Sequence, residues 1–484
     1  MHLQITNKLT LALDAFRFNF ESAGALELVD EYSGLASEAA PILPSQSSGM
    51  HVPLHKLAQW SGMMNQLTDT QYTAYVGIDW AAAKHDICVQ AADDGRREFA
   101  CISSQPEGID AWAQALHRRF GGPIAVALEL SKGPIVSALQ KYDFFVLYPI
   151  NPSTLAKYRE AFTPSGAKDD PTDAELAVDL ITRHPERFNP LKPQSVDMRK
   201  LIGLVEQRDK FVSDQGRLVN RLGHALRQYY PQVLEWFSEH NTVVFCDFLS
   251  QWPTLTQVKR ARKASLERFF RSHHVNSAEL IERRITAIKA AMPLTLDAAV
   301  IDPHRLQVEI LVEQLRITIK ALKRFDDEIS ATAHKLPDYA LLFSPLPGAA
   351  KVLAPRLLAA FGEDRQRYPQ ADALQKYSGI APVTKRSGKT TWVHWRWQCP
   401  TFVRQTFVDW AAQTINKSAW AGAYYRQQRA KGCSYQVAVR ALAFKWIRIL
   451  HRCWQNRTPY DESKYLDALR RKGSPLLKYL AETA

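Results

Sequence analysis

The chain has 484 residues, of which 46% are hydrophobic and 23% charged, and its formal net charge is +13. The apolar fraction excludes a fully disordered chain, and no apolar run reaches the roughly 18 residues of a membrane helix. The six cysteines form no Cys-x-x-Cys pair, and the N-terminus lacks a basic segment followed by an apolar stretch. These features argue against a disulfide scaffold, a zinc ribbon and a secretory signal, and they favour a cytoplasmic protein.

The N-terminal residues differ in composition from the rest of the chain. Residues 1–63 hold 3 basic and 6 acidic residues, and residues 41–49 form a Pro/Ser/Gly-rich stretch that is typical of a linker. We expect residues 1–71 to be an N-terminal extension of unknown role, outside the catalytic unit. A translation start at Met63 or Met64 is an alternative interpretation.

Residues 72–190 are predicted to form an α/β domain. Short apolar runs bounded by turn residues predict strands at 75–79, 86–90, 97–103, 124–130 and 144–150. Apolar residues at helical spacing predict helices at 106–120, 134–142, 153–162 and 171–182. Three strands at hairpin distance, followed by alternating helices and strands, indicate a mixed five-stranded sheet with helices packed on it.

Residues 191–338 are predicted to be helical. Residues 196–240 and 305–335 are long amphipathic stretches with apolar residues three or four positions apart. We interpret the region as a helical or coiled-coil spacer that also mediates oligomerisation. An ordinary helical domain core fits the same pattern equally well.

Residues 339–460 are predicted to form a further compact unit, followed by a basic tail at 461–484. Pro347-Gly348 precedes a helix, as in a helix-hairpin-helix turn that presents backbone N–H groups to a phosphate. A basic, Gly-containing loop follows at 378–390. The alternation of Trp392, Trp395 and Trp397 predicts a half-buried strand, and helices are expected at 402–417 and 435–454.

Positive charge is concentrated in the C-terminal part of the chain. From Lys376 to the end there are 20 basic and 5 acidic residues, whereas the rest of the chain has a net charge of −2. This distribution is typical of a polyanion-binding surface, and the interleaved Trp, Tyr and Arg residues favour nucleic acid over a merely solvated face. The candidate contacts are Lys385, Arg386, Lys389, Arg396 and Arg404.

Four acidic residues stand where the predicted sheet would bring them together. Asp79 lies at the end of the first strand, Glu129 ends the fourth, and Asp170 and Asp173 begin a helix after the fifth. The first and fourth strands are neighbours in such a sheet, and i, i+3 spacing puts Asp170 and Asp173 on one helix face. Four carboxylates can hold two Mg²⁺ (or Mn²⁺) ions that support in-line phosphoryl transfer.

Other interpretations of these acids remain open. Residues 170–173, Asp-Pro-Thr-Asp, also make a good helix start with an N-cap and a proline at the first helical position. Residues 77–79, Gly-Ile-Asp, also fit sugar kinases and actin-like ATPases, although Trp80 and three alanines replace their Gly-Thr-rich phosphate turn. Helix capping does not explain Glu129, which interrupts an apolar strand.

An ordered set of motifs between residues 74 and 455 resembles the DEDD transposases of insertion sequences. The motifs are Gly77-Ile-Asp79-Trp-Ala-Ala-Ala-Lys84, Leu128-Glu129, Lys168-Asp-Asp170-Pro-Thr-Asp173-Ala174, Pro347-Gly348, Tyr377-Ser-Gly-Ile-Ala-Pro382 and Ser387-Gly388-Lys389. This family includes the Piv invertase and the bridge-RNA-guided recombinases. The resemblance implies an RNase H-like (RuvC-like) domain, a coiled-coil linker and a mainly α C-terminal transposase domain.

The resemblance also implies a mechanism. The acidic tetrad of the family maps onto Asp79, Glu129, Asp170 and Asp173, and its nucleophilic serine maps onto Ser387. Such proteins join DNA through a serine–phosphate intermediate, with acids and serine meeting between the subunits of a dimer or tetramer. A structured guide RNA encoded beside the gene selects the partner DNA. The resemblance thus implies a protein that acts at the nucleoid, in the cytoplasm of a prokaryote.

This chain departs from the family pattern in three places. The N-terminal extension has no counterpart, and Ala349-Ala350 follows the Pro-Gly turn where a second glycine is more usual. Asp169 precedes Asp170 and leaves two possible registers, of which i, i+3 spacing to Asp173 favours Asp170.

Ser387 is a plausible nucleophile on its own chemistry. It lies between Arg386 and Gly388-Lys389, where basic groups can hold a phosphate and stabilise developing negative charge. A loop that only binds phosphate, or a nucleophilic Ser378, are the alternatives.

We therefore predict a transposase or site-specific DNA recombinase of an insertion sequence. A metal-dependent nuclease of the Holliday-junction resolvase type, with water as the nucleophile, is one alternative. A non-catalytic nucleic-acid-binding protein, which would tolerate loss of the acids, is the other.

Overall fold

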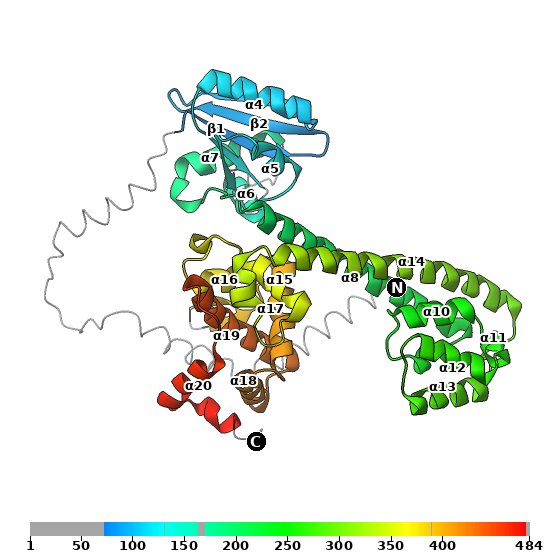
Figure 1. Cartoon of the computed structure of the whole chain (residues 1–484). Helices are drawn as coiled ribbons and strands as arrows, with labels where there is room; N and C mark the ends of the chain where they lie inside the picture. Colours follow the sequence, from blue (N-terminus) through cyan, green and yellow to red (C-terminus); the bar gives the residue numbers. More distant parts are fainter. Residues whose placement is uncertain (1–71, 130, 163–169, 389, 481–484) are drawn as a thin grey trace. The chain divides into compact units, whose positions relative to one another are not determined.

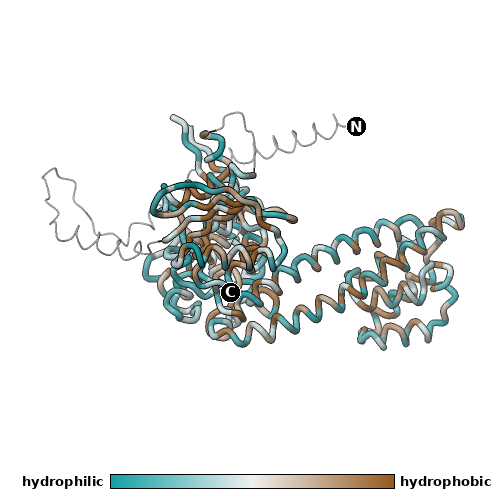
Figure 2. Tube along the Cα trace, turned by 90° about the horizontal axis from the view of Figure 1, so that it is seen from above, coloured by the Kyte–Doolittle hydropathy of each residue, from teal (hydrophilic) through white to brown (hydrophobic). Residues whose placement is uncertain are grey.

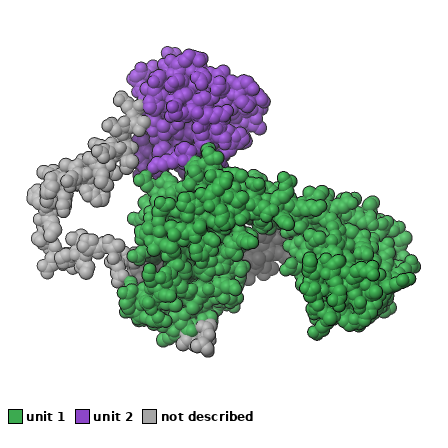
Figure 3. All heavy atoms as spheres, viewed as in Figure 1, with its two compact units in different colours: residues 1–40, 194–484 green, residues 41–193 purple. Residues whose placement is uncertain are grey.

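The computed structural model describes residues 72–129, 131–162, 170–388 and 390–480, which form two compact units, 72–193 and 194–480 (Figure 3). The predicted N-terminal extension at residues 1–71 lies outside the described residues. Within the described ranges, no helix has the length and apolar character needed to cross a membrane.

Residues 72–193 contain a five-stranded mixed sheet with the strand order β3-β2-β1-β4-β5. Strand β2 is antiparallel to both β1 and β3, whereas β4 runs parallel to both β1 and β5. The strands are β1 (Ala74–Trp80), β2 (Lys84–Ala91), β3 (Arg97–Ser103), β4 (Ile124–Leu128) and β5 (Phe145–Pro149). The predicted α/β fold of the RNase H-like type is confirmed, including the adjacency of the first and fourth strands.

Helices cover both faces of this sheet (Figure 1). One core includes Val76 and Ile78 and residues of α4 (Pro106–Phe120) and α5 (Pro134–Leu139). On the other face, Leu176 and Leu180 lie in a cluster with Ala125 and Ala127, and the helices are α6 (Pro152–Phe162) and α7 (Asp170–Arg183). Alternate strand residues point to opposite faces, so each strand serves both cores.

The absence of a side chain at Gly77 lets α7 lie directly on β1. A Cβ atom at this position would stand 1.9 Å from the carbonyl oxygen of Ala174. Arg97, which is level with Tyr75 in the sheet, forms an ion pair with Asp179 further along α7. Helix α7 therefore runs antiparallel to β1, and its first turn lies toward the end of that strand.

The unit of residues 194–480 contains two long helices that lie side by side, α8 (Val196–Tyr229) and α14 (Ala298–Ala333) (Figure 1). They run antiparallel, since Lys200 bonds to Glu328 near one end of the pair. Hydrophobic and hydrophilic stretches alternate along both helices (Figure 2), as amphipathic helices require. The prediction of two long amphipathic helices is confirmed, although the first ends at Tyr229 and not near residue 240.

A small helical module connects α8 to α14 and shares a hydrophobic core with the adjoining ends of both helices. Its aromatic residues include Trp236, Phe245, Phe248 and Phe270, all buried. The module consists of α9 (Val233–Trp236), α10 (Val243–Gln251), α11 (Leu255–Arg260), α12 (Lys263–Ser272) and α13 (Ala278–Ala290).

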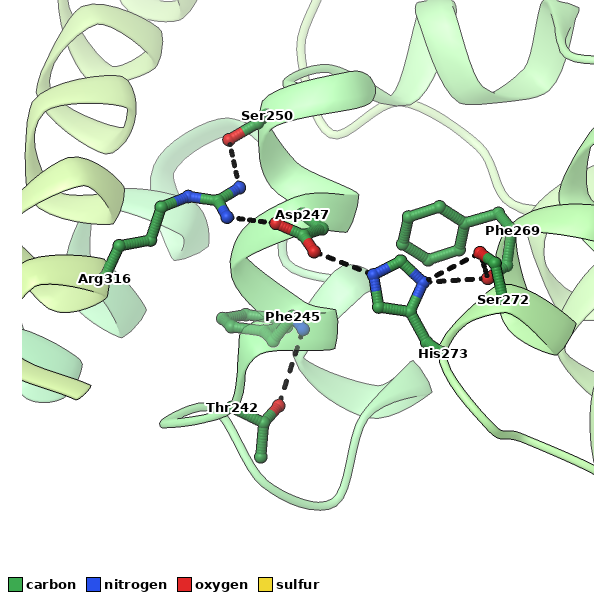
Figure 4. A network of polar contacts seen from close by, with 8 residues as sticks. All are labelled: Thr242, Phe245, Asp247, Ser250, Phe269, Ser272, His273 and Arg316. Atoms are coloured by element: carbon green, nitrogen blue, oxygen red, sulfur yellow. Dashed lines mark hydrogen bonds and ion pairs between the residues drawn. The ribbon is translucent and has the colours of Figure 1, made fainter. Parts of the chain in front are cut away.

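A polar network ties this module to α14 (Figure 4). The Asp247 carboxylate accepts hydrogen bonds from His273 Nε2 at 2.7 Å and from Arg316 Nη1. Nη2 of the same arginine donates to Ser250 Oγ at 3.0 Å. Burial alone would raise the pKa of Asp247, but the hydrogen bonds from His273 and Arg316 lower it below its ordinary value. The folded module therefore stabilises the ionised form of Asp247.

We expect Asp247→Asn to loosen the module at neutral pH. A depressed carboxyl pKa contributes stability above the unfolded pKa of about 4 and loses it as pH falls through the folded value. At pH 7 the variant should exchange amide hydrogens in α10 and α12 about fivefold faster than wild type, the effect of about 1 kcal/mol for a half-buried bond. At pH 3 the difference should shrink. Asp302→Asn, an exposed acid of α14, is the matched control, and equal rates for both variants at pH 7 would contradict this account.

The C-terminal part, residues 339–480, is mainly helical and packs around four fully buried tryptophans, Trp410, Trp420, Trp446 and Trp454. Its helices are α15 (Ala350–Phe361), α16 (Ala371–Tyr377), α17 (Thr401–Thr414), α18 (Ala419–Ala430), α19 (Tyr435–Gln455) and α20 (Glu462–Arg471), with short turns η3 (Tyr339–Phe343), η4 (Arg365–Arg367) and η5 (Pro475–Tyr479). A two-stranded hairpin is formed by β6 (Val383–Ser387) and β7 (Thr390–His394).

Several details of this part differ from the sequence-based expectation. The expected basic loop is largely the β6–β7 hairpin, and only Trp392 lies in its second strand. Trp395 and Trp397 follow the strand and are 40% and 78% exposed, so the expected half-buried strand is wrong. Tertiary packing of other tryptophans fills the core instead. The residues expected as a basic tail include α20 and η5, and Leu476 there is buried against the core.

The Pro347-Gly348 turn packs against α17. The carbonyl oxygen of Pro347 accepts a hydrogen bond from Trp410 Nε1 at 2.9 Å. Gly348 has a φ of +70°, and a Cβ there would stand 3.0 Å from the Gln413 carbonyl oxygen. This close contact explains why a glycine is needed at position 348 without any contact to a phosphate.

Candidate active site

The register of the sheet places Asp79 and Glu129 at the same level. Ile78 of β1 is paired with Leu128 of β4 in parallel, and Asp79 and Glu129 are the residues that follow. Both residues are half-buried. The two neighbouring parallel strands therefore each carry an acid at the same level near their ends, as the sequence pattern predicts.

Helix α7 contributes the third described acid. Asp173 directly precedes Ala174, the residue in contact with Gly77, and α7 runs antiparallel to β1, so its first turn lies toward Asp79. The Asp173 side chain is 2% exposed. Asp170 is the first residue of α7, and its side chain lies outside the described residues.

The Asp173 carboxylate is paired with a cation. Nε and Nη2 of Arg159, on α6, both lie 2.5 Å from its Oδ1 atom. This pair compensates the burial of a charge that would otherwise be costly. Sequence analysis did not identify Arg159, because its contact depends on how α6 crosses α7 and leaves no motif.

A further acid, Asp86, lies beside Asp79. The two residues face each other across the antiparallel pair of β1 and β2, where opposite side chains lie on the same face of the sheet. Asp86 also forms an ion pair with Lys84, with Nζ and Oδ2 3.7 Å apart. The signal for Asp86 was available in the sequence, because centring the hairpin on residues 81–84 pairs it with Asp79.

The donor set has the chemistry that a divalent ion needs. Asp79, Glu129 and Asp173 supply the hard oxygen atoms that Mg²⁺ and Mn²⁺ prefer. Within the described ranges, no group of three or more potential ligands is close enough to hold a metal ion, and Asp173 is engaged by Arg159. The acids therefore fit a divalent metal in chemical type, but in this structure the described acids do not form a coordinating group, and Arg159 competes with a metal for Asp173.

Ser387 belongs to the other compact unit, 194–480. It is the last residue of β6, pairs with Thr390, and is exposed at the tip of the hairpin. Gly388 follows with a φ of +55°, a left-handed conformation that suits a tight turn. Lys385 and Arg386 are exposed on the same strand, whereas Lys389 lies outside the described residues.

Ser378, the alternative nucleophile, is fully buried at 0% exposure. Its hydroxyl donates to the carbonyl oxygen of Gln375 at 3.2 Å. A hydroxyl in this environment is inaccessible to a DNA phosphate, so accessibility favours Ser387.

Two family models match the chain, and the first extends from the sheet domain through helix α8. Residues 76–231 match a family model described as a transposase, and residues 340–426 match the model of the IS116/IS110/IS902 family of transposases. The chain belongs to this transposase family. Together the two matches span about half of the chain, and members of the family cut and rejoin DNA. The predicted resemblance and the predicted enzyme class are confirmed.

The similarity to several relatives covers most of the length of this transposase. It is 28% identical to the mini-circle transposase candidate for IS117 of Streptomyces coelicolor, over 81% of this chain and 96% of the relative. It is 25% identical to a 44.8 kDa protein of insertion element IS116 from Streptomyces clavuligerus, over 78% and 93%. A 42 kDa protein of insertion element IS900 from Mycobacterium paratuberculosis is 22% identical over 80% and 96%.

Proposed function

We propose that this transposase cuts and rejoins DNA of its insertion sequence through a serine–phosphate intermediate. The observation that carries the proposal is the parallel register that puts Asp79 and Glu129 at one level, with the start of α7 beside them. Together with the family match, it favours a catalytic protein over a simple nucleic-acid-binding protein.

The proposed reaction starts at Ser387. Its Oγ attacks a phosphorus atom of the DNA backbone, a new P–O bond forms, and the bond to the leaving sugar oxygen breaks. The serine proton passes to a carboxylate of the acid set, and that carboxyl then donates it to the leaving sugar oxygen. In the second half, a sugar hydroxyl of another DNA end attacks the same phosphorus, joins the strands and releases Ser387.

Asp79, Glu129, Asp170 and Asp173 would hold Mg²⁺ (or Mn²⁺) in this proposal. When bound, such ions neutralise the charge that develops on the phosphate oxygens. Asp86 adds negative charge beside Asp79, and Arg159 keeps Asp173 in place until a ligand replaces it. The acids and Ser387 would act together in the active assembly, either within one chain or between subunits.

The partners of this proposal are DNA and a structured guide RNA. The concentration of 20 basic against 5 acidic residues from Lys376 onward supports binding to both. Lys385, Arg386 and Lys389 flank the serine in sequence, and Arg396 and Arg404 lie in the same part of the chain. The nucleoid would be the site of action.

The proposed function is tested with purified protein, DNA carrying the ends of its element, target DNA and the RNA transcribed from the adjoining segment. Joined DNA that depends on Mg²⁺ and on the RNA supports the proposal. Cut DNA without joining, in the absence of the RNA, would instead favour the nuclease of the resolvase type.

An apolar stripe on the α8–α14 pair supports self-association. Leu306, Ile310 and Ile317 of α14 are 56%, 48% and 70% exposed at near-heptad spacing. Two grooves on the same pair are lined by these residues together with Phe211 and Leu218 of α8. Exposed apolar residues in a row are typical of a helical interface.

We expect Ile317→Asp to weaken the dimer or tetramer. A charge at the centre of an apolar helical interface should raise the dissociation constant about 10- to 100-fold, measured by analytical ultracentrifugation. Leu296→Asp, at a site that is 77% exposed and lies before α14 begins, is the control. An unchanged dissociation constant for Ile317→Asp would remove the stripe from the interface.

A further inference from the structure

Two arginines lie over the ring of Trp395 and a third follows it in the chain, all without a carboxylate partner among the described residues. The guanidinium carbon of Arg440, on α19, lies 3.0 Å from the centre of the Trp395 ring, and that of Arg404, on α17, lies 5.4 Å from it. Arg396 follows Trp395 directly and donates from Nε to the carbonyl oxygen of Ala381 at 3.4 Å. Across the part of the chain that the structure describes, none of the three arginines forms an ion pair with a carboxylate.

The hydrogen bonds of Arg440 leave one donor over. Its Nη2 and Nε donate to the carbonyl oxygens of Gly379 and Ile380, the latter at 3.3 Å, whereas Nη1 is buried without a partner. Burial, together with the charge of Arg404, lowers the pKa of Arg440 to about 10. Like charges that converge without a counterion are unfavourable, and an orphaned buried donor points to a missing partner. Both features are relieved by an anion.

Exposed aromatic rings lie close to Trp395 in the chain. Trp392, Trp395 and Trp397 are 47%, 40% and 78% exposed within six residues of chain. Clustered exposed tryptophans mark a binding surface, and their flat faces are the usual platform for unpaired bases. A phosphate alone would account for the arginines but leave these rings unexplained.

The cluster lies at the root of the hairpin that carries Ser387. Val383 pairs with His394 at the root, Trp395 follows His394, and Ser387 pairs with Thr390 at the tip. Four residues of strand separate root and tip, or about 13 Å. A DNA strand bound at the arginines would therefore lie within about 13 Å of the proposed nucleophile.

We propose that Arg396, Arg404 and Arg440 bind phosphates of an unpaired DNA strand whose bases stack on Trp397. Trp395 covers Arg440 and moves aside when the strand enters, so that Nη1 gains its missing partner. The inference rests on the proposed function in one respect, since DNA is preferred over RNA because the scissile DNA must reach Ser387.

The test measures binding of the full chain without divalent metal, so that chemistry plays no part. The probes are a fluorescently labelled single DNA strand, the matching duplex, and an RNA strand of the same sequence, each titrated at several salt concentrations. The variants are Arg404→Gln, Arg440→Gln and Trp397→Ala. Arg452→Gln is the matched control, an exposed arginine on the same helix as Arg440, about 18 Å further along.

Arg404→Gln and Arg440→Gln should each weaken single-strand DNA binding and reduce the slope of log affinity against log salt by about 0.7. Trp397→Ala should weaken single-strand binding roughly 5- to 100-fold and leave the duplex nearly unaffected. Arg452→Gln should behave as wild type. Arg404 and Trp397 are solvent-accessible, so their variants keep the test valid if Arg440→Gln fails to fold.

The proposal is overturned if Arg404→Gln and Trp397→Ala bind the DNA strand as the Arg452→Gln control does. A loss confined to the RNA strand overturns it as well. Because metal is absent, these outcomes are independent of the serine mechanism. Weaker binding by the Arg404→Gln and Trp397→Ala variants supports this site even if the separate experiment with Mg²⁺ finds no covalent adduct, a result that would refute only the proposed nucleophile.

Discussion

Replacing Asp79 by Asn should abolish DNA strand cleavage while leaving the fold and DNA affinity nearly intact. Asp79 is half-buried near the end of β1, so the isosteric amide fills the same space while it removes the negative charge and a proposed metal ligand. We expect the cleavage rate in Mg²⁺ to fall roughly 100-fold or more. The measurement is strand cleavage of labelled DNA, with circular dichroism and DNA binding recorded in parallel.

Two further substitutions sharpen this result. Asp143→Asn, at an exposed position of the same unit, should cleave as wild type does. Asp86→Asn, across the hairpin from Asp79, should cause a smaller loss, because it changes the charge near the site without removing a proposed ligand. Cleavage by Asp79→Asn at a near wild-type rate in Mg²⁺ would refute the assignment of the acids.

Replacing Ser387 by Ala should eliminate a covalent protein–DNA adduct that survives denaturation. The Ser387 hydroxyl is exposed at the hairpin tip and can form a phosphoester, and Ala removes it without disturbing a buried position. The adduct is measured by denaturing gel electrophoresis of labelled DNA with the full chain and Mg²⁺. Ser387→Cys should retain weak activity at most, because a thiolate is a softer nucleophile toward a metal-polarised phosphate.

Ser378→Ala is the matched control for this experiment. Ser378 is buried and bonded to a backbone carbonyl, so its variant should still form the adduct. An adduct that persists in Ser387→Ala and disappears in Ser378→Ala would move the nucleophile to the buried serine. Full cleavage by Ser387→Ala without any adduct would support water as the nucleophile.

The sheet of residues 72–193 could be read from the sequence because its signals are local. Alternating apolar residues give the strands, and the chain order makes the first and fourth strands neighbours, which brings Asp79 and Glu129 to one level. The same reasoning identified Asp173 as a candidate acid but did not predict its partner. Its ion pair with Arg159 arises where two helices cross. No spacing rule predicts such a contact.

The C-terminal unit was harder to predict for a physical reason. Alternation of Trp392, Trp395 and Trp397 resembles a half-buried strand, but the core is already filled by Trp410, Trp446 and other buried rings. Tertiary packing therefore overrides a local pattern. The role of Arg440 could not be predicted from the sequence, because it lies in an amphipathic helix and resembles any solvated arginine there. Only the fold brings it to Trp395.

The contact between Gly77 and Ala174 bears on how inactive copies of such an element arise. Any side chain at position 77 would push α7 away from β1 and displace Asp173 from its place beside the strand ends. A copy with that single change would keep every reactive group and still be silent. Intact acids and an intact serine are therefore an incomplete criterion for a working copy, and a residue with no chemistry of its own belongs in the same test.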